Sequence, residues 1–167
     1  MPTRRHVLAL LSAAPIAQGC SNNLPDPIAA WRAPGAGETD PRRFALAHAI
    51  LAPNPHNRQP WLIDLIGENE MVLSADLDRL LPATDPFDRQ IVLGCGAFLE
   101  LFDLAARANG RRAEINLWPE GEPQPRLDAR PIAHVRLIEE DIGKDVLFDH
   151  ILARRTNRKP YQDRAVP

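Results

Sequence analysis

Two stretches of the chain carry the side chains best suited to bind a ligand. The first, residues 153–164, reads ARRTNRKPYQDR and places five positive charges in twelve residues. Arginine binds phosphate oxygens through two parallel hydrogen bonds, and hydroxyl and amide groups can complete such a site. The same cations could instead be the solvated end of a helix, where positive charge offsets the helix dipole. The residue types alone leave both interpretations open.

The second stretch, residues 52–61, reads APNPHNRQPW. Its three prolines fix φ and remove amide donors, so it fits neither a helix nor a strand interior. A stiff loop can present Asn57 and Gln59 to the polar edge of a heteroaromatic ring at little ordering cost. The alternative is a structural turn whose amides cap the preceding helix. Both interpretations stay open at this point.

The other chemically active side chains give weak signals. None of the five histidines pairs with another ligand at metal spacing, so we predict no metal site. We expect His48 to be a packed or surface histidine and Cys95 to be an inert core thiol. The chain has no GxSxG motif and no P-loop, and Gly94-Cys95-Gly96 falls inside a predicted helix.

The N-terminal half of the chain predicts a helix and a hairpin around the proline-rich loop. Asp40 and Pro41 form an N-cap and a first-turn proline, followed by a helix to about Leu51. Residues 61–66 and 71–75 are short apolar runs on either side of GENE, which predicts a hairpin with a four-residue loop.

A long apolar helix forms the predicted centre of the fold. It starts with Asp85 as the N-cap and Pro86 in the first turn, and it ends at Asn109-Gly110. Its apolar residues at helical spacing are Phe87, Ile91, Cys95, Phe98, Phe102 and Ala105. Gly94 and Gly96 lower helix propensity, so we expect another backbone segment to pack close to them.

Two strands and a last helix complete the predicted framework. Residues 113–118 and 132–138 alternate as strands, the second with Ala133, Val135 and Leu137 facing inward. A helix is predicted from Lys144 to about Arg154. The order of elements predicts an α+β fold in which an antiparallel sheet packs on the long central helix.

The composition of the chain argues against some classes of protein. The chain has 167 residues, is 44% hydrophobic and 25% charged, and carries a formal charge of −2. These values fit one globular domain with a real core. No basic cluster outweighs its acidic neighbours, which argues against a nucleic-acid partner. No apolar run approaches the ~20 residues needed to span a bilayer.

Residues 1–19 are similar to a twin-arginine signal peptide. Arg4 and Arg5 precede an apolar run over residues 7–17, which ends in an AQGC sequence that resembles a lipobox at Cys20. We therefore expect export through the twin-arginine route and a periplasmic protein, attached to the membrane if a lipid modifies Cys20. An amphipathic N-terminal helix is the alternative. Residues 20–39 are rich in proline, glycine and polar residues, and predict a flexible tether.

The motifs HNRQPW, DPFDRQ, GCGAFLEL and RRTNR, in this order, resemble the nitroreductase-like FMN proteins. The resemblance covers residues 40–164. Within this group, the sequence most resembles the Acg-type members, which carry two nitroreductase-like halves in one chain. Proteins of this kind bind FMN at the interface of two halves, so the resemblance implies FMN as the cofactor. The resemblance places four residues next to the phosphate and ribityl chain of FMN: Arg154, Arg155, Thr156 and Arg158. On the ring side it places Pro53, Asn54, Pro55 and Asn57.

The resemblance also implies a domain organisation. Residues 40–152 would be the first nitroreductase-like half, and residues 153–167 the start of a second half that the chain does not contain. No RRSxR stretch precedes the first helix, so we expect one flavin per chain. The second half of the same chain, or a partner subunit, would complete the flavin site. We expect the fragment alone to be inactive.

The implied function is an FMN-dependent oxidoreductase. It would pass electrons through flavin N5 to a nitro compound, a quinone or a similar small-molecule acceptor, from a donor that the sequence does not identify. No catalytic side chain can be assigned. Because NAD(P)H is a cytoplasmic donor, an exported protein could instead bind or sequester flavin without turnover. A cofactor-free exported lipoprotein that acts as a binding module is a third interpretation.

Overall fold

The computed structural model describes residues 26–160 and residue 163. The predicted signal peptide and the predicted lipidation site Cys20 therefore lie outside the described residues. The helices and strands, in chain order, are α2 (Ala29–Arg32), α3 (Pro41–Ala49), β1 (Trp61–Ile66), β2 (Glu70–Ala75), α4 (Arg89–Ala108), β3 (Arg112–Leu117) and β4 (Ala133–Ile138). Three short 3-10 helices lie at η1 (Pro55–Asn57), η2 (Leu77–Arg79) and η3 (Val146–His150).

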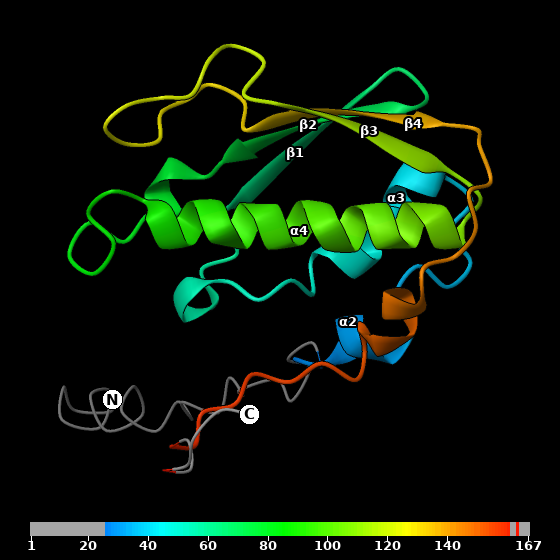
Figure 1. The fold of residues 1–167 in the computed structure, drawn as a ribbon, viewed down its shortest axis with the longest axis horizontal. Helices are drawn as coiled ribbons and strands as arrows, with labels where there is room; N and C mark the ends of the chain where they lie inside the picture. Colours follow the sequence, from blue (N-terminus) through cyan, green and yellow to red (C-terminus); the bar gives the residue numbers. More distant parts are fainter. Residues whose placement is uncertain (1–25, 161–162, 164–167) are drawn as a thin grey trace, which may run out of the picture.

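The four strands form one antiparallel sheet in the order β1-β2-β4-β3. The long helix α4 lies across one face of this sheet (Figure 1). Strand β4 presents Ala133, Val135 and Leu137 to the core, each at most 3% exposed, as their alternation predicts. The structure therefore confirms the predicted α+β fold with an antiparallel sheet on a central helix. This architecture is consistent with the half-domain that the sequence resemblance implies.

Helix α4 supplies most of the core. Its residues Ile91, Cys95, Phe98, Phe102 and Ala105 all have an exposed fraction of 0%, so the helical spacing in the sequence identified the buried stripe. Each fully buried Phe or Ile side chain contributes about 1.5–3 kcal/mol relative to the exposed side chain. The helix ends as predicted, because Asn109 is its C-cap and Gly110 follows at a φ of +67°.

The start of α4 differs from the prediction. The helix begins at Arg89, and its N-cap is Asp88 in the left-handed region at a φ of 56°. Asp85 still caps the helix, but from further away, because its Oδ2 accepts hydrogen bonds from the backbone of Gln90 and Ile91. The turn at Asp88 leaves Phe87 63% exposed, so its predicted place on the apolar face was wrong.

The first helix and the hairpin follow the prediction with two differences. Asp40 caps α3 by accepting a hydrogen bond from the backbone of Arg42 at 2.9 Å. His48 is a packed histidine, as expected, and its Nδ1 lies 2.9 Å from the carbonyl of Phe44. The helix ends at Ala49 rather than Leu51. Glu70 joins strand β2 opposite Ile66, which shortens the hairpin loop from four residues to three.

The predicted helix from Lys144 to Arg154 is wrong. Only the short helix η3 forms, started by Asp145, whose side chain accepts a hydrogen bond from the backbone of Leu147. Ile151 is buried, but Leu147 and Leu152 are 52% and 38% exposed. A short helix gains most of its stability from a packed apolar face, and this segment has too little of one to continue.

The segment before α3 is described from residue 26 onward. Within the range predicted to be a tether, it forms α2, whose Trp31 packs against the small apolar cluster of Leu51, Leu104 and Ile151. In Figure 1, α2 lies beside the segment that follows η3. No helix in residues 26–160 is both long enough and apolar enough to cross a membrane.

Candidate functional site

The proline-rich loop between α3 and β1 is held in its shape by its own amides. Asn54 donates from Nδ2 to the carbonyl of Ala52 at 3.1 Å and accepts at Oδ1 from the backbone of Gln59 at 2.8 Å. Three of its residues have left-handed φ values, namely His56 at 49°, Asn57 at 54° and Gln59 at 49°. Non-glycine residues adopt this conformation only where surrounding contacts require it. These internal contacts therefore define the shape of the loop.

Two contacts fix the loop to the sheet. The carbonyl of the buried Pro60 accepts from the backbone of Asp76 at 2.8 Å. The guanidinium of Arg58 donates to the carbonyls of Asp78 and Arg79 at 3.0 and 2.8 Å. The loop and the turn after β2 therefore form one unit.

The loop lies directly against α4 at Gly94. A Cβ atom on Gly94 would lie 3.2 Å from the Cβ of Asn54 and 3.4 Å from the Cδ of Pro55. The prediction that another segment packs against this glycine is therefore confirmed. At Gly96 it is wrong, because a Cβ there would meet nothing within 4 Å.

The basic segment, which is the described part of residues 153–164, follows η3 and contacts the chain just before the proline-rich loop. Arg154 donates from Nη2 to the carbonyl of Leu51 at 3.0 Å, which joins positions 103 residues apart. Arg155 donates from Nη1 to the carbonyls of Leu152 and Arg154, both at 2.7 Å. The guanidinium carbons of Arg154 and Arg155 lie 5.5 and 5.4 Å from the centre of the Trp31 ring.

The positive charge of this segment has no carboxylate partner within the part of the chain that the structure describes. Arg154, Arg155 and Arg158 form no ion pair there, and the acceptors of the first two are neutral carbonyls and one hydroxyl. The Nε of Arg154 is buried and lacks a hydrogen-bond partner among the described residues. The predicted helix to Arg154 does not form, since η3 ends at His150, and a turn in which the backbone of Arg154 donates to the carbonyl of His150 at 2.9 Å follows it. The arrangement favours an anion, which would supply the missing acceptors.

The two stretches line one groove with a volume of about 360 Å³. Its lining residues are Pro53, Asn54 and Pro55 from the loop, Gln90, Leu93, Gly94 and Ala97 from α4, and Thr156 and Arg158 from the basic segment. Five of the eight predicted cofactor residues therefore meet in one place. Of the three others, Arg154 and Arg155 lie beside it and Asn57 does not line it.

Arg154 and Arg155 line a neighbouring hollow of about 320 Å³ with Ile28, Trp31, Leu152 and Thr156. Thr156 is common to both sites, so the hollow and the groove adjoin at this residue. Asn57 lines neither, and its Oδ1 accepts a hydrogen bond from Nε2 of Gln59 at 3.3 Å.

Sequence reasoning missed two contributions to this region. Gln90, Leu93 and Ala97 recur on one face of α4 around Gly94, and that spacing was a usable signal. Trp31 had no such signal, because it stands in a segment whose composition predicts a tether.

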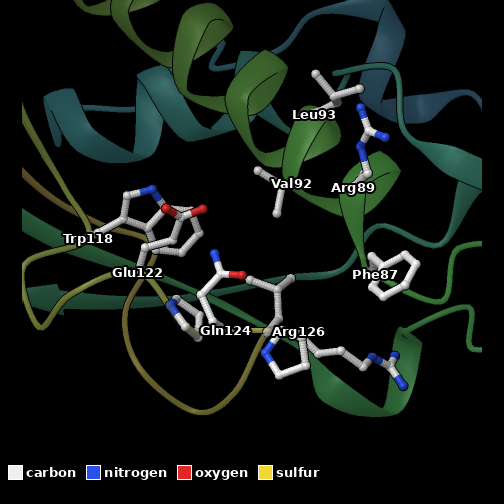
Figure 2. A pocket seen from close by; sticks show the side chains of 11 residues that line it. Phe87, Arg89, Val92, Leu93, Trp118, Glu122, Gln124 and Arg126 are labelled. Atoms are coloured by element: carbon white, nitrogen blue, oxygen red, sulfur yellow. The ribbon is translucent and has the colours of Figure 1, made fainter.

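A larger hollow of about 580 Å³ lies at the N-terminal end of α4. Figure 2 shows Trp118 and Glu122 on one side of it and Arg89 and Leu93 on the other. Leu93 also lines the groove, so the two sites adjoin along this side chain. The guanidinium of Arg126 binds the buried carboxylate of Asp88 at 2.8 and 3.1 Å, and this pairing raises the pKa of Arg126.

Among the residues that the structure describes, the groove is lined by side chains that can bind a ligand, and none of them titrates near neutral pH. The groove contains no carboxylate, imidazole, amine, phenol or thiol among its lining residues. Cys95 lies in the core, where burial raises its thiol pKa to about 12, so it is the inert thiol that the sequence predicts. No group of three or more metal-ligating side chains occurs among the residues described.

The known proteins that this chain resembles include three from Mycobacterium tuberculosis. "Putative NAD(P)H nitroreductase acg" is 34% identical over 125 residues, which are 75% of this chain and 37% of that protein. "Putative NAD(P)H nitroreductase Rv3131" is 32% identical over 125 residues, which are 75% of this chain and 35% of that protein. "Uncharacterized protein Rv3127" is 33% identical over 123 residues, which are 70% of this chain and 34% of that protein.

The chain thus spans little more than a third of the length of the curated relatives it matches. No protein-family profile matches it. The first two of these relatives are named as NAD(P)H nitroreductases.

Proposed function

We propose that this chain is the N-terminal part of an Acg-type, FMN-dependent oxidoreductase that reduces a nitro compound, a quinone or a similar acceptor. One observation carries the proposal. The proline-rich loop and the basic segment, joined by the bond from Arg154 to Leu51, line a single groove whose cations lack carboxylate partners in the described part of the chain. The similarity to two proteins named as NAD(P)H nitroreductases supports the reaction class.

The residues present fit FMN in charge and in hydrogen-bonding groups. Arg158 and Thr156, with Arg154 and Arg155 beside them, would hold the phosphate, since guanidinium and hydroxyl groups are its usual partners. The preformed loop at Asn54 would lie along the ring, where its defined shape lowers the ordering cost of binding. When bound, FMN supplies the hydride and electron transfer that no lining side chain can provide.

We propose that a second half completes this site. The matched region covers 37% of the relative named acg, so most of that protein has no counterpart in the match. Residues 153–167 would then begin the second nitroreductase-like half, which follows in the same chain or is replaced by a partner subunit. One flavin would bind between the two halves.

We further propose export through the twin-arginine route, with a lipid on Cys20 as the membrane attachment. The twin arginine, the apolar run and the AQGC sequence support this. Incorporation of a fatty-acid analogue should be seen in the wild type and lost in Cys20→Ala. A Cys20→Ala variant that is still labelled would rule out lipidation at this residue.

Substitution of the arginines that would bind the FMN phosphate tests the cofactor assignment. In the full-length protein, Arg158→Ala and Arg154→Ala should each weaken FMN binding about 10- to 100-fold, the factor expected for a lost charged hydrogen bond of ~1.5–3 kcal/mol. Equilibrium dialysis with FMN measures this. The matched control is Arg136→Ala, because Arg136 lies on the outer face of the sheet paired with Glu70. Unchanged FMN binding in both site variants would refute the assignment, and a wild type that binds no flavin would favour the cofactor-free binding module.

Flavin binding without turnover is the second candidate function. The absence of any proton-exchanging side chain among the groove residues favours it, as does the predicted export away from NAD(P)H. Anaerobic mixing of the FMN-loaded protein with NAD(P)H, followed by a nitroaromatic compound, separates the two. Bleaching and recovery of the flavin absorbance supports the oxidoreductase. A flavin that no pyridine nucleotide reduces would support a flavin-binding role.

A further inference from the structure

We propose that Trp31 is a positioning residue that gives the site its preference for FMN over phosphate-free flavins. The inference rests on the proposed function, because it concerns how the basic segment is prepared for phosphate. The residue stands in α2, more than a hundred positions before the arginines that it contacts.

Trp31 lies under both guanidinium groups at once. The guanidinium carbon of Arg154 is 5.5 Å from the centre of its ring, and that of Arg155 is 5.4 Å from it. Both distances fall within the ~6 Å over which the electron-rich face of an indole attracts a cation. The ring itself is half-buried and packs against the cluster of Leu51, Leu104 and Ile151.

Among the described residues, Arg154 and Arg155 lack other groups that could offset their positive charges. They are adjacent in sequence, so their like charges repel each other, and no carboxylate in the described residues compensates them. Their hydrogen bonds go mainly to neutral carbonyls. A long arginine side chain also loses rotamer freedom when it is held in one geometry. The indole face offsets the repulsion without neutralising the charge, which a carboxylate would do.

Trp31 acts on the groove through the arginines and not directly. It lines the neighbouring hollow but not the groove, and the two sites share only Thr156. Loss of the ring should therefore weaken the phosphate contacts and leave the loop that faces the flavin ring unchanged. The consequence is selective, because FMN carries a phosphate and riboflavin does not.

The test compares two flavins in the full-length protein. Trp31→Leu keeps an apolar side chain on the cluster but removes the aromatic face. We expect about a tenfold loss of FMN affinity and a change of less than about twofold for riboflavin, measured by quenching of flavin fluorescence. Trp31→Phe retains an aromatic face and should recover most of the FMN affinity.

Ile28→Ala is the matched control. Ile28 lies in the same segment and lines the same hollow, but it has no aromatic face that could attract a cation. It should leave both affinities unchanged. Equal losses for FMN and riboflavin in Trp31→Leu, or an unchanged FMN affinity, would overturn the inference. A wild type that binds neither flavin would instead refute the proposed function, so the two failures are distinguishable.

Discussion

At the scale of single residues, the partner of an arginine decides its role. Arg42 is nearly buried and binds the carboxylate of Asp40, while its Nη1 donates to three carbonyls of the β1–β2 hairpin, so it is structural. Arg154 has a carbonyl, a hydroxyl and an indole face as partners and keeps its charge available. The sequence shows the same side chain in both places. Only the fold determines which arginines can meet an anion.

The Asp40–Arg42 pair should make stability depend on pH. Hydrogen bonds from Arg42 hold the pKa of Asp40 below its ordinary value of 3.8. This stabilisation is fully present above pH 3.8 and is lost as the pH falls through the lower pKa of the folded state. The free energy of unfolding in urea should therefore drop in this acidic range for the wild type. Asp40→Asn should lower stability at neutral pH and remove this component of the drop.

The control for this pH dependence is Asp64→Asn. Asp64 lies exposed on strand β1. It should leave both the stability at neutral pH and the acidic drop unchanged. An Asp40→Asn variant that keeps the full acidic drop would show that other carboxylates cause it.

At the scale of elements, α4 both fills the core and shapes the groove. One face carries the buried aromatic residues, and another carries Gln90, Leu93 and Gly94 along the groove. Gly94 belongs to both functions, because the proline-rich loop occupies the space that a side chain would need. Residue spacing predicted the core face, whereas the groove face depends on a loop that comes from another part of the chain.

Gly94 and Gly96, the two glycines of α4, allow the contact between the helix and the loop to be tested. Alanine is favoured over glycine in a helix interior by about 1 kcal/mol. Gly96→Ala should gain stability of this order, since its new Cβ meets nothing within 4 Å. Gly94→Ala should gain less or lose stability, because its Cβ meets Asn54 at 3.2 Å and displaces the loop. Thermal unfolding of both variants measures the difference, and equal gains would contradict the close contact.

Gly94→Ala should also affect the ligand. Displacement of the loop at Asn54 should weaken FMN and riboflavin alike, since the loop faces the proposed ring site and not the phosphate site. Gly96→Ala serves as the control and should bind both flavins as the wild type does.

At the scale of the whole molecule, the sequence predicted the architecture better than the site. The α+β class, the strand order along the chain and the buried stripe of α4 follow from apolar spacing and helix caps, which are local signals. The helix over residues 144–154 failed because its apolar residues find little to pack against. The contact of Trp31 with Arg154 and Arg155 could not be predicted, because composition says nothing of contacts between the two ends of a chain.

Ligand binding should stabilise the complete protein. A ligand that binds only the folded state adds about 2.7 kcal/mol at a concentration 100 times its Kd. The melting temperature of the full-length protein should therefore rise with added FMN. Arg158→Ala should show a smaller rise at the same concentration, and Arg136→Ala the same rise as the wild type. A melting temperature independent of FMN in the wild type would contradict the proposal.

The bond from Arg154 to Leu51 also bears on the order in which the molecule folds. The sheet and α4 are complete by residue 138, whereas the groove needs contact between positions 103 residues apart. Such a contact forms only after a long loop has closed, and few buried apolar groups support it here. The groove should thus be the last part to assemble and the first to open by local unfolding. A newly made chain would acquire its core before it acquired any capacity to hold a ligand.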